Sequence, residues 1–215
     1  MAENIVIVGA KRTPIGSMQG KFNLMTASQL GAVAIKAAVE QAGVKPNEVD
    51  DLIFGNVLGA GQGQAPARQA ALGAGLDKST PATTINKMCG SGMKAAMMAF
   101  DSLSAGNSTI VVAGGMESMT NAPHLLPKGR GGIRYGHGQV LDHMAFDGLE
   151  NAYDGKPMGH FADATAKKYG FTRENMDEYA KESTNLVAKK REAEQSRHPS
   201  CAEHQQNKPG CRRHG

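Results

Sequence analysis

One cysteine, Cys89, stands where a reactive thiol is expected. It is followed by the small residues Gly90, Ser91 and Gly92 and then by a segment with the apolar spacing of a helix. A thiolate just before a helix faces the positive end of the helix dipole and free backbone N–H groups. Small neighbours also let a substrate approach the sulfur. The pattern favours nucleophilic catalysis by Cys89, with a small buried core residue as the alternative.

The other two cysteines belong to a second pattern, near the carboxyl end of the chain. Cysteine and histidine occur there at short spacings, which is similar to the ligand pairs of a tetrahedral zinc site. However, the pattern mixes ligand types and few apolar residues accompany it. We therefore expect no bound metal and favour a segment without fixed structure. The residues are His198, Cys201, His204, Cys211 and His214.

Other familiar motifs are incomplete. Residues 89–93 begin like a papain-type motif but lack its second cysteine, and Ser91 lacks the glycine that precedes a hydrolase nucleophile. Residues 59–64 lack the third glycine of a dinucleotide-binding loop, and the sequence has no P-loop. The remaining histidines follow no metal-ligand spacing, so each is expected at the surface or hydrogen-bonded. They are His124, His137, His143 and His160.

Composition excludes other classes of protein. The chain has 215 residues, 40% hydrophobic and 20% charged, which is typical of a globular protein with a core. Aromatic residues make up 5% and Trp is absent, so a base-stacking nucleic-acid module is not supported. No uncharged apolar run reaches the ~18 residues of a membrane span, and the first residues lack a signal-peptide pattern. We expect a cytoplasmic protein that binds neither membrane nor nucleic acid.

The net charge of +4 belongs to the end of the chain alone. Residues 1–185 carry equal numbers of basic and acidic side chains, whereas residues 186–215 carry seven Lys and Arg against three Asp and Glu. That tail has only two large aliphatic side chains, Leu186 and Val187. We therefore expect a folded part up to about residue 185 and then a basic, disordered tail.

The segments that must position Cys89 alternate between strand and helix patterns. Short apolar runs predict strands at 5–8, 51–54 with 57–58, 83–85 and 110–113. The segments between them have helical period, and a short helix is predicted at 66–75. This order predicts an α/β fold with a mainly parallel sheet. The side chains expected on the buried stripes of the two longer helices are Leu30, Val33, Ala34, Ala37 and Ala38, and Met93, Ala96, Met97, Phe100 and Leu103.

The pattern changes after this part. Residues 119–160 are rich in Gly and Pro and lack a clear period, as is typical of a functional excursion. Residues 161–170 and 173–184 are expected to be helical, with Thr172 as the N-cap of the second helix.

Stretches spread along residues 1–185 resemble the thiolase family, and specifically its biosynthetic type. The stretch with the cysteine reads Asn-Lys-Met-Cys-Gly-Ser-Gly, and a later one reads Gly-Gly-Met-Glu-Ser-Met. Ketoacyl synthases also place a cysteine before a helix, but they are not expected to carry the second motif. The matching stretches are 12–16, 63–70, 86–92, 114–119, 147–149 and 157–159.

The resemblance implies an α/β domain and a reaction. Cys89 would take an acyl group from acyl-CoA as a thioester. A second acetyl-CoA would then attack that thioester in a Claisen condensation to acetoacetyl-CoA, and thiolysis is the reverse. The enzyme would be an acetyl-CoA C-acetyltransferase that works as a homo-oligomer, a tetramer in the family. No separate cofactor is implied, because the coenzyme A thioester is the substrate.

The resemblance also implies a division of the chain. Residues 1–118 would form the family's amino-terminal α/β domain, and 119–185 would form part of its loop domain, which covers coenzyme A. Residues 186–215 would lie outside the family pattern. Leu149 and Met158 would fall in stretches that line the pantetheine channel, although Pro157 replaces the histidine often found beside that methionine.

Family members continue with residues that this sequence lacks. These are a Gly-His-Pro histidine that activates the nucleophile, an Asn-Glu-Ala-His asparagine, and a second cysteine that acts as acid and base. Arg197-His198-Pro199 matches the first of these only partly. Three hypotheses stay open at this point: an acetyltransferase by descent, an inactive fragment or interaction module, and metal binding by the tail.

Overall fold

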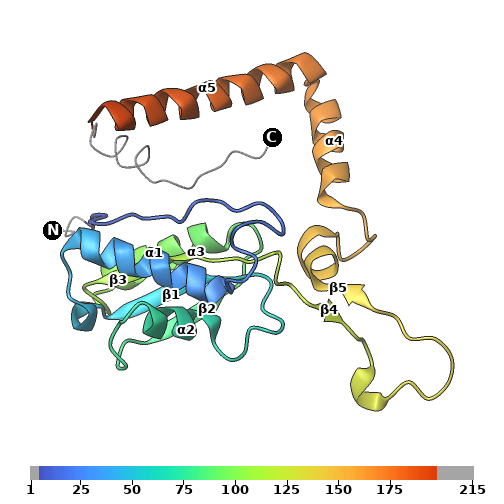
Figure 1. Ribbon diagram of the computed structural model, residues 1–215, viewed down its shortest axis with the longest axis horizontal. Helices are drawn as coiled ribbons and strands as arrows, with labels where there is room; N and C mark the ends of the chain where they lie inside the picture. Colours follow the sequence, from blue (N-terminus) through green and yellow to red (C-terminus); the bar gives the residue numbers. More distant parts are fainter. Residues whose placement is uncertain (1–4, 198–215) are drawn as a thin grey trace, which may run out of the picture. The chain divides into compact units, whose positions relative to one another are not determined.

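Three parallel strands bring their carboxyl ends to one edge of a sheet (Figure 1). The computed structural model describes the backbone of residues 5–197 and the side chains of residues 5–189. Leu52 in the central strand is in register with Ala82 on one side and Val112 on the other. The predicted parallel α/β sheet is therefore confirmed. In spatial order the strands are β2 (Ala82–Ile85), β1 (Asp51–Gly55) and β3 (Val111–Gly115).

The chain divides into two compact units, Met1–Pro157 and Met158–Gly215, and each is described by itself. The sheet and the Cys89 turn belong to the first unit. The boundaries expected from the sequence, after residues 118 and 185, assign parts of the chain to domains of the family. That assignment stays a prediction.

Helices α1 (Ala27–Ala42) and α2 (Pro66–Gly73) pack on each other over one face of the sheet. Thr26 begins α1 with a capping box, since its hydroxyl accepts from the Gln29 N–H and the Gln29 side chain accepts from the Thr26 N–H. Gly43 ends the helix in the left-handed conformation, as predicted. The core under these helices includes Ile35 and Leu52, the largest fully buried side chains.

Helix α3 (Ser91–Ser104) covers the other face of the sheet with small residues. Its buried side chains are Ser91, Ala95 and Ala99. The stripe predicted to be buried is largely open, because Met93 and Phe100 are 74% and 57% exposed. The prediction for α1 is likewise wrong at Val33, which is exposed. In both helices the residues nearest the sheet are small or β-branched, and the predicted stripe lies to one side of them.

The predicted strand at 5–8 is not formed. These residues pair with no strand of the described chain, and the Ile7 side chain is 90% exposed. Residues 5–13 lie opposite β3, across an apolar cavity that both segments line. The physical reason is the lack of a neighbour, because an apolar run becomes a strand only when another strand satisfies its backbone.

The excursion after β3 is irregular, as predicted. Two-residue strands pair antiparallel, His124 with Asp142 and Leu125 with Leu141. Further 3₁₀ turns are short. In chain order the remaining elements of the first unit are η1 (Pro46–Glu48), β4 (His124–Leu125), η2 (Gly129–Gly131), β5 (Leu141–Asp142) and η3 (Ala145–Leu149), the last a π-helical turn.

The second unit contains helices α4 (Met158–Tyr169) and α5 (Arg173–Arg197). Thr172 caps α5 as predicted, since its hydroxyl accepts from the Asn175 N–H at 3.2 Å. The helix passes residue 185, where the sequence predicted the start of a disordered tail. Residues 186–197 contain no Gly or Pro, and their Ala, Lys, Arg, Glu and Gln residues favour helix, although Leu186 and Val187 are their only large aliphatic side chains. Among the described helices, none is both long and apolar enough to cross a bilayer.

Candidate functional site

Cys89 lies in a tight turn between β2 and α3, as predicted, and its side chain is exposed and free. Asn86 begins the turn, since its side-chain oxygen accepts from the Met88 N–H at 2.9 Å. The Ser91 hydroxyl closes it by accepting from the Lys87 N–H at 2.9 Å and donating to the Met88 carbonyl at 2.6 Å. Met88 takes the left-handed conformation with φ +48°, which turns the chain sharply just before the cysteine.

Backbone hydrogen bonds also hold this turn. The N–H groups of Gly90 and Ser91 donate to the carbonyl oxygens of Lys87 and Met88. These two donors therefore stabilise the turn and are not free to bind an anion. The sulfur is held on a well-defined loop at the amino end of α3, where the helix dipole favours negative charge.

Glycines let the start of α3 approach the ends of β1 and β3. A Cβ built on Gly55 would lie 2.6 Å from the Ser91 Cβ. A Cβ on Gly115 would lie 3.7 Å from the Gly92 Cα, which is an ordinary van der Waals contact. The absence of a side chain at Gly55 therefore brings the start of α3 against the carboxyl end of β1. That edge of a parallel sheet is the usual place for a ligand site.

Glu117, two residues after β3, fixes the loop that follows β1. Its carboxylate accepts from the Asn56 side-chain amide and the Val57 N–H, both at 2.8 Å, and from the Leu58 N–H at 3.2 Å. Residues 57 and 58 were predicted to extend the strand. That prediction is wrong because their N–H groups donate to this carboxylate and not to a neighbouring strand.

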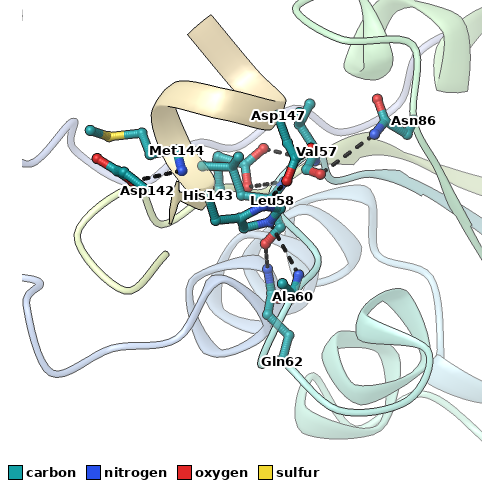
Figure 2. Close-up of polar contacts among 10 residues, drawn as sticks. Val57, Leu58, Ala60, Gln62, Asn86, Asp142, His143, Met144 and Asp147 are labelled. Atoms are coloured by element: carbon teal, nitrogen blue, oxygen red, sulfur yellow. Dashed lines mark hydrogen bonds and ion pairs between the residues drawn. The ribbon is translucent and has the colours of Figure 1, made fainter. Parts of the chain in front are cut away.

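The loop held by Glu117 contacts the cysteine turn. The Asn86 side-chain amide reaches the Val57 carbonyl at 3.5 Å, and the same Asn86 orients Met88. A continuous set of polar contacts therefore runs from Glu117 through Val57 and Asn86 to the residue before Cys89. Figure 2 shows Asn86 pointing at Val57 from the opposite segment.

His143 is buried and hydrogen-bonded in the same region (Figure 2). Its Nδ1 lies 2.5 Å from the Asp147 carboxylate, and the Ala60 N–H donates to its Nε2 at 3.3 Å. Because Nε2 accepts, the ring proton belongs on Nδ1, where it is donated to Asp147. Nε2 thus joins the excursion to the loop after β1 through Ala60, and Nδ1 is held by Asp147 within the excursion. This outcome matches the prediction of a hydrogen-bonded histidine and leaves no nitrogen for catalysis.

The two residues predicted to line a pantetheine channel fall in different units. Leu149 ends η3 in the first unit, and Met158 begins α4 in the second. Both side chains are partly open, at 39% and 45% exposure. Their roles toward coenzyme A stay predictions.

No group of three or more potential metal ligands occurs among the residues that the structure describes. The Cys and His pattern of residues 198–214 lies outside those residues.

Sequence reasoning found Cys89 but missed Asn56, Glu117 and the His143–Asp147 pair. A signal for the first two was present, because each is a polar residue that follows an apolar strand segment, Asn56 after 51–54 and Glu117 after 110–113, at the edge where sites form. The histidine pair had no such signal, since it depends on the path of the irregular excursion.

Comparison with known proteins shows that this chain matches the amino-terminal part of the members of an enzyme family. The family described as "Thiolase, N-terminal domain" matches residues 5–198. An acetyl-CoA acetyltransferase from Cupriavidus necator is 52% identical over 182 residues, which cover 85% of this chain and 46% of that protein. A mitochondrial acetyl-CoA acetyltransferase A from Xenopus laevis is 52% identical over 176 residues, covering 82% and 41%. This chain spans about half the length of the curated relatives that it matches.

A solved structure agrees with the sequence comparison. The Acat5 thiolase from Ascaris suum, solved in complex with coenzyme A, is 42% identical with a TM-score of 0.78. The match covers 82% of this chain and 46% of that one.

Proposed function

The chain belongs to the thiolase family of acyltransferases, and we propose that its Cys89 accepts the acetyl group of acetyl-CoA as a thioester. The observation that carries this proposal is the exposed Cys89 sulfur on a constrained turn at the amino end of α3. The family's named relatives and the coenzyme A bound to the Ascaris suum thiolase support the choice of substrate.

The proposed step exchanges one thioester for another. The Cys89 sulfur attacks the carbonyl carbon of the acetyl group, and the bond from that carbon to the coenzyme A sulfur breaks. The proton of the Cys89 thiol ends on the departing coenzyme A thiol. Negative charge develops first at Cys89 and then at the carbonyl oxygen, beside the positive end of the α3 dipole.

The complete reaction needs a second step, and no base for it is hydrogen-bonded to the cysteine turn among the residues that the structure describes. Condensation removes a proton from the α carbon of a second acetyl-CoA, which requires a positioned base. The buried His143 is hydrogen-bonded to Asp147 and Ala60, and no histidine among the described residues is hydrogen-bonded to the turn. We therefore assign acyl-group acceptance to this chain, and the Claisen condensation to an enzyme that also contains the rest of the family's length.

Trapping the acyl enzyme tests this proposal. The full chain is incubated with acetyl-CoA, and intact mass with peptide mapping locates the added acetyl group. We expect acetylation of Cys89 that hydroxylamine reverses, as it does for a thioester, and none at that peptide in Cys89→Ala. Equal hydroxylamine-sensitive acetylation of the two proteins would refute it.

Alkylation gives an independent readout of the same sulfur. Iodoacetamide should label Cys89 faster than Cys201 and Cys211 in folded protein, because the turn presents the sulfur beside the helix start. Slower labelling of Cys89 would count against a nucleophile.

A second candidate function, an interaction module, is favoured by the outer surface of α3. Met93, Met97 and Phe100 lie one helical turn apart and are all exposed. An apolar stripe of this kind on a soluble domain marks a surface for another protein segment. Self-association into a homo-oligomer and a cytoplasmic location are further proposals, and the Xenopus laevis relative is named as mitochondrial.

A further inference from the structure

A histidine lies where the excursion, residues 119–160, contacts the loop after β1 (Figure 2). The Ala60 N–H donates to the His143 Nε2 at 3.3 Å, although the two residues are 83 positions apart in the sequence. The His143 side chain is almost fully covered, with 8% of it exposed. Both segments belong to the first compact unit. A titratable group that the proposed acyl transfer does not use is therefore buried in the contact between them.

The rest of this contact is apolar and close. Leu58 of the loop is buried, and a Cβ added to Gly148 of η3 would lie 3.1 Å from the Leu58 Cδ2. Among the described residues, the bond from Ala60 to His143 is the only hydrogen bond between the loop after β1 and the excursion. The polar part of the contact therefore depends on one lone pair of the imidazole.

A second proton on the His143 ring would remove that lone pair. The ring already carries a proton on Nδ1, which it donates to Asp147. A histidine protonated on both nitrogens is a donor at both, so its Nε2–H would meet the Ala60 N–H, donor against donor. The contact would also have to bury the charged ring, since His143 is 6% exposed. Protonation of Nε2 and the bond to Ala60 therefore exclude each other.

The charged groups around His143 do not reverse this effect. Asp147 is four positions away in the same excursion, and Asp142 is adjacent in sequence, so both act on the ring whether or not the excursion contacts the loop. Glu117 is on the loop side, where three hydrogen-bond donors already compensate its carboxylate. His124 pairs with Asp142 across β4 and β5 and is a second titratable group, which the experiments below separate from His143.

We infer that His143 is a pH-sensitive contact, which holds the excursion on the loop after β1 while its ring is neutral and releases it when Nε2 takes up a proton. In this step one proton moves from water to Nε2, the hydrogen bond from Ala60 breaks, and the Ala60 N–H is donated to water instead. The same loop reaches the cysteine turn, because the Asn86 amide lies 3.5 Å from the Val57 carbonyl. The inference does not rest on acylation of Cys89.

The direction of the pH dependence follows from proton linkage. The released form binds a proton at Nε2 that the held form excludes, so the held form gains stability as the pH rises and loses it as the pH falls. Imidazoles ordinarily exchange a proton between about pH 5 and about pH 8, and carboxyl groups do so near about pH 4. We therefore expect release on acidification within the imidazole range.

Hydrogen exchange at the Ala60 amide of the full chain tests the inference. Residue-resolved exchange is expressed as a protection factor, which removes the intrinsic effect of pH on the exchange rate. Since one excluded proton weakens the held form by up to tenfold per pH unit, the Ala60 protection factor should fall at least about fivefold from about pH 8 to about pH 5.5. The Leu52 amide, bonded to the Pro81 carbonyl inside the sheet, should change less than about twofold. A constant protection factor at Ala60 would overturn the inference.

Matched variants assign the dependence to one histidine. His143→Gln keeps a side-chain oxygen that accepts a hydrogen bond but takes up no proton, so its Ala60 protection should stay within about twofold over the same pH range. His124→Gln changes the exposed histidine opposite Asp142 and should keep the fall of the wild type. Circular dichroism melts check that both variants fold. A fall that persists in His143→Gln, or that disappears in His124→Gln, would overturn the assignment.

A measurement on the wild-type protein keeps the test independent of how well glutamine fits the site. Nitrogen NMR of the histidine rings shows which ring nitrogen carries the proton. At high pH, His143 should be protonated on Nδ1 alone. On acidification, protonation of Nε2 and the shift of the Ala60 amide signal should share one midpoint, within about 0.3 pH unit, because they report a single equilibrium. Midpoints further apart, or a proton on Nε2 at high pH, would overturn the inference.

Discussion

The two helical layers on the sheet are closed to different degrees. Helices α1 and α2 pack on each other and bury Ile35 and Leu52 completely beneath them. Helix α3 covers the opposite face with Ala95 and Ala99 and leaves its larger apolar side chains exposed. The layer of α1 and α2, called the closed layer, buries large apolar side chains. The layer of α3, called the open layer, has the apolar spacing of a core, but most of its large apolar side chains are exposed among the described residues.

The position of Cys89 gives this difference a functional meaning. The cysteine turn leads into α3, so Cys89 belongs to the layer of α3. Gly55 and the loop that Glu117 holds lie at the carboxyl edge of the sheet. The described residues thus position the Cys89 sulfur, and none of the described histidines is hydrogen-bonded to its turn.

The largest expected effect concerns turnover at the open layer. This chain alone should catalyse acetoacetyl-CoA thiolysis at least about 10⁴-fold more slowly than the intact Cupriavidus necator relative. A positioned acid or base contributes ~10²–10⁴-fold, and losses within a catalytic unit are not additive. The assay follows loss of acetoacetyl-CoA enolate absorbance with added coenzyme A, comparing the chain with its Cys89→Ala variant. Cys89-dependent turnover near that of the relative would show that the open layer already contains a base.

Stability should depend on the closed layer far more than on the open one. Leu52→Ala removes a fully buried side chain and should lower the free energy of unfolding by about 2–5 kcal/mol. Met97→Ala, on the exposed stripe of α3, should change it by less than about 0.5 kcal/mol. Urea denaturation with a common slope measures both. A comparable loss at Met97 would mean that the stripe is covered in solution.

The Glu117 carboxylate, which supports the cysteine turn, should contribute less to the free energy of unfolding than the Leu52 side chain and more than the Met97 side chain. Glu117→Gln removes a charged acceptor shared by three donors and should destabilise the chain by about 1–3 kcal/mol. Glu150→Gln changes an exposed carboxylate in the same way and serves as the control. Thermal and urea unfolding give the difference. If the two variants match, the carboxylate contributes no more than a surface charge.

The smallest effect is a dependence on pH at the sheet. Backbone N–H groups of Ile110 and Thr109 donate to Asp50 and hold the pKa of its carboxyl below the ordinary 3.8. Its contribution is therefore present above that ordinary value and is lost as the pH falls through the lowered one. The Tm advantage of the wild type over Asp50→Asn should shrink between about pH 5 and about pH 3. A growing advantage at low pH would contradict the sign of this prediction.

Most regular elements could be predicted because their signals are local. Thr26, Gln29 and Gly43 mark the ends of α1, and short apolar runs mark β1, β2 and β3. The cysteine turn was also predictable, because glycine and serine follow a strand and precede a helical period. Local spacing was sufficient in each case.

The errors occur where distant residues decide the structure. Val57 and Leu58 leave the strand because of Glu117, which lies 60 and 59 positions away. Residues 5–8 have the composition of a strand, but their pairing depends on a neighbour that the described chain does not supply. An apolar pattern reports that a side chain is suited to burial, and it cannot report which segment will cover it.

Gly55 limits how sequences of this kind can vary. Any side chain at this position would overlap the start of α3, since a Cβ there meets Ser91 at 2.6 Å and the Gly92 N at 3.0 Å. A library that randomises position 55 should therefore lose its variants under selection for Cys89 reactivity, although the residue lies in a different strand from the one that leads to the cysteine. The set of residues accepted at position 55 therefore measures how closely α3, the helix that follows Cys89, must approach the sheet.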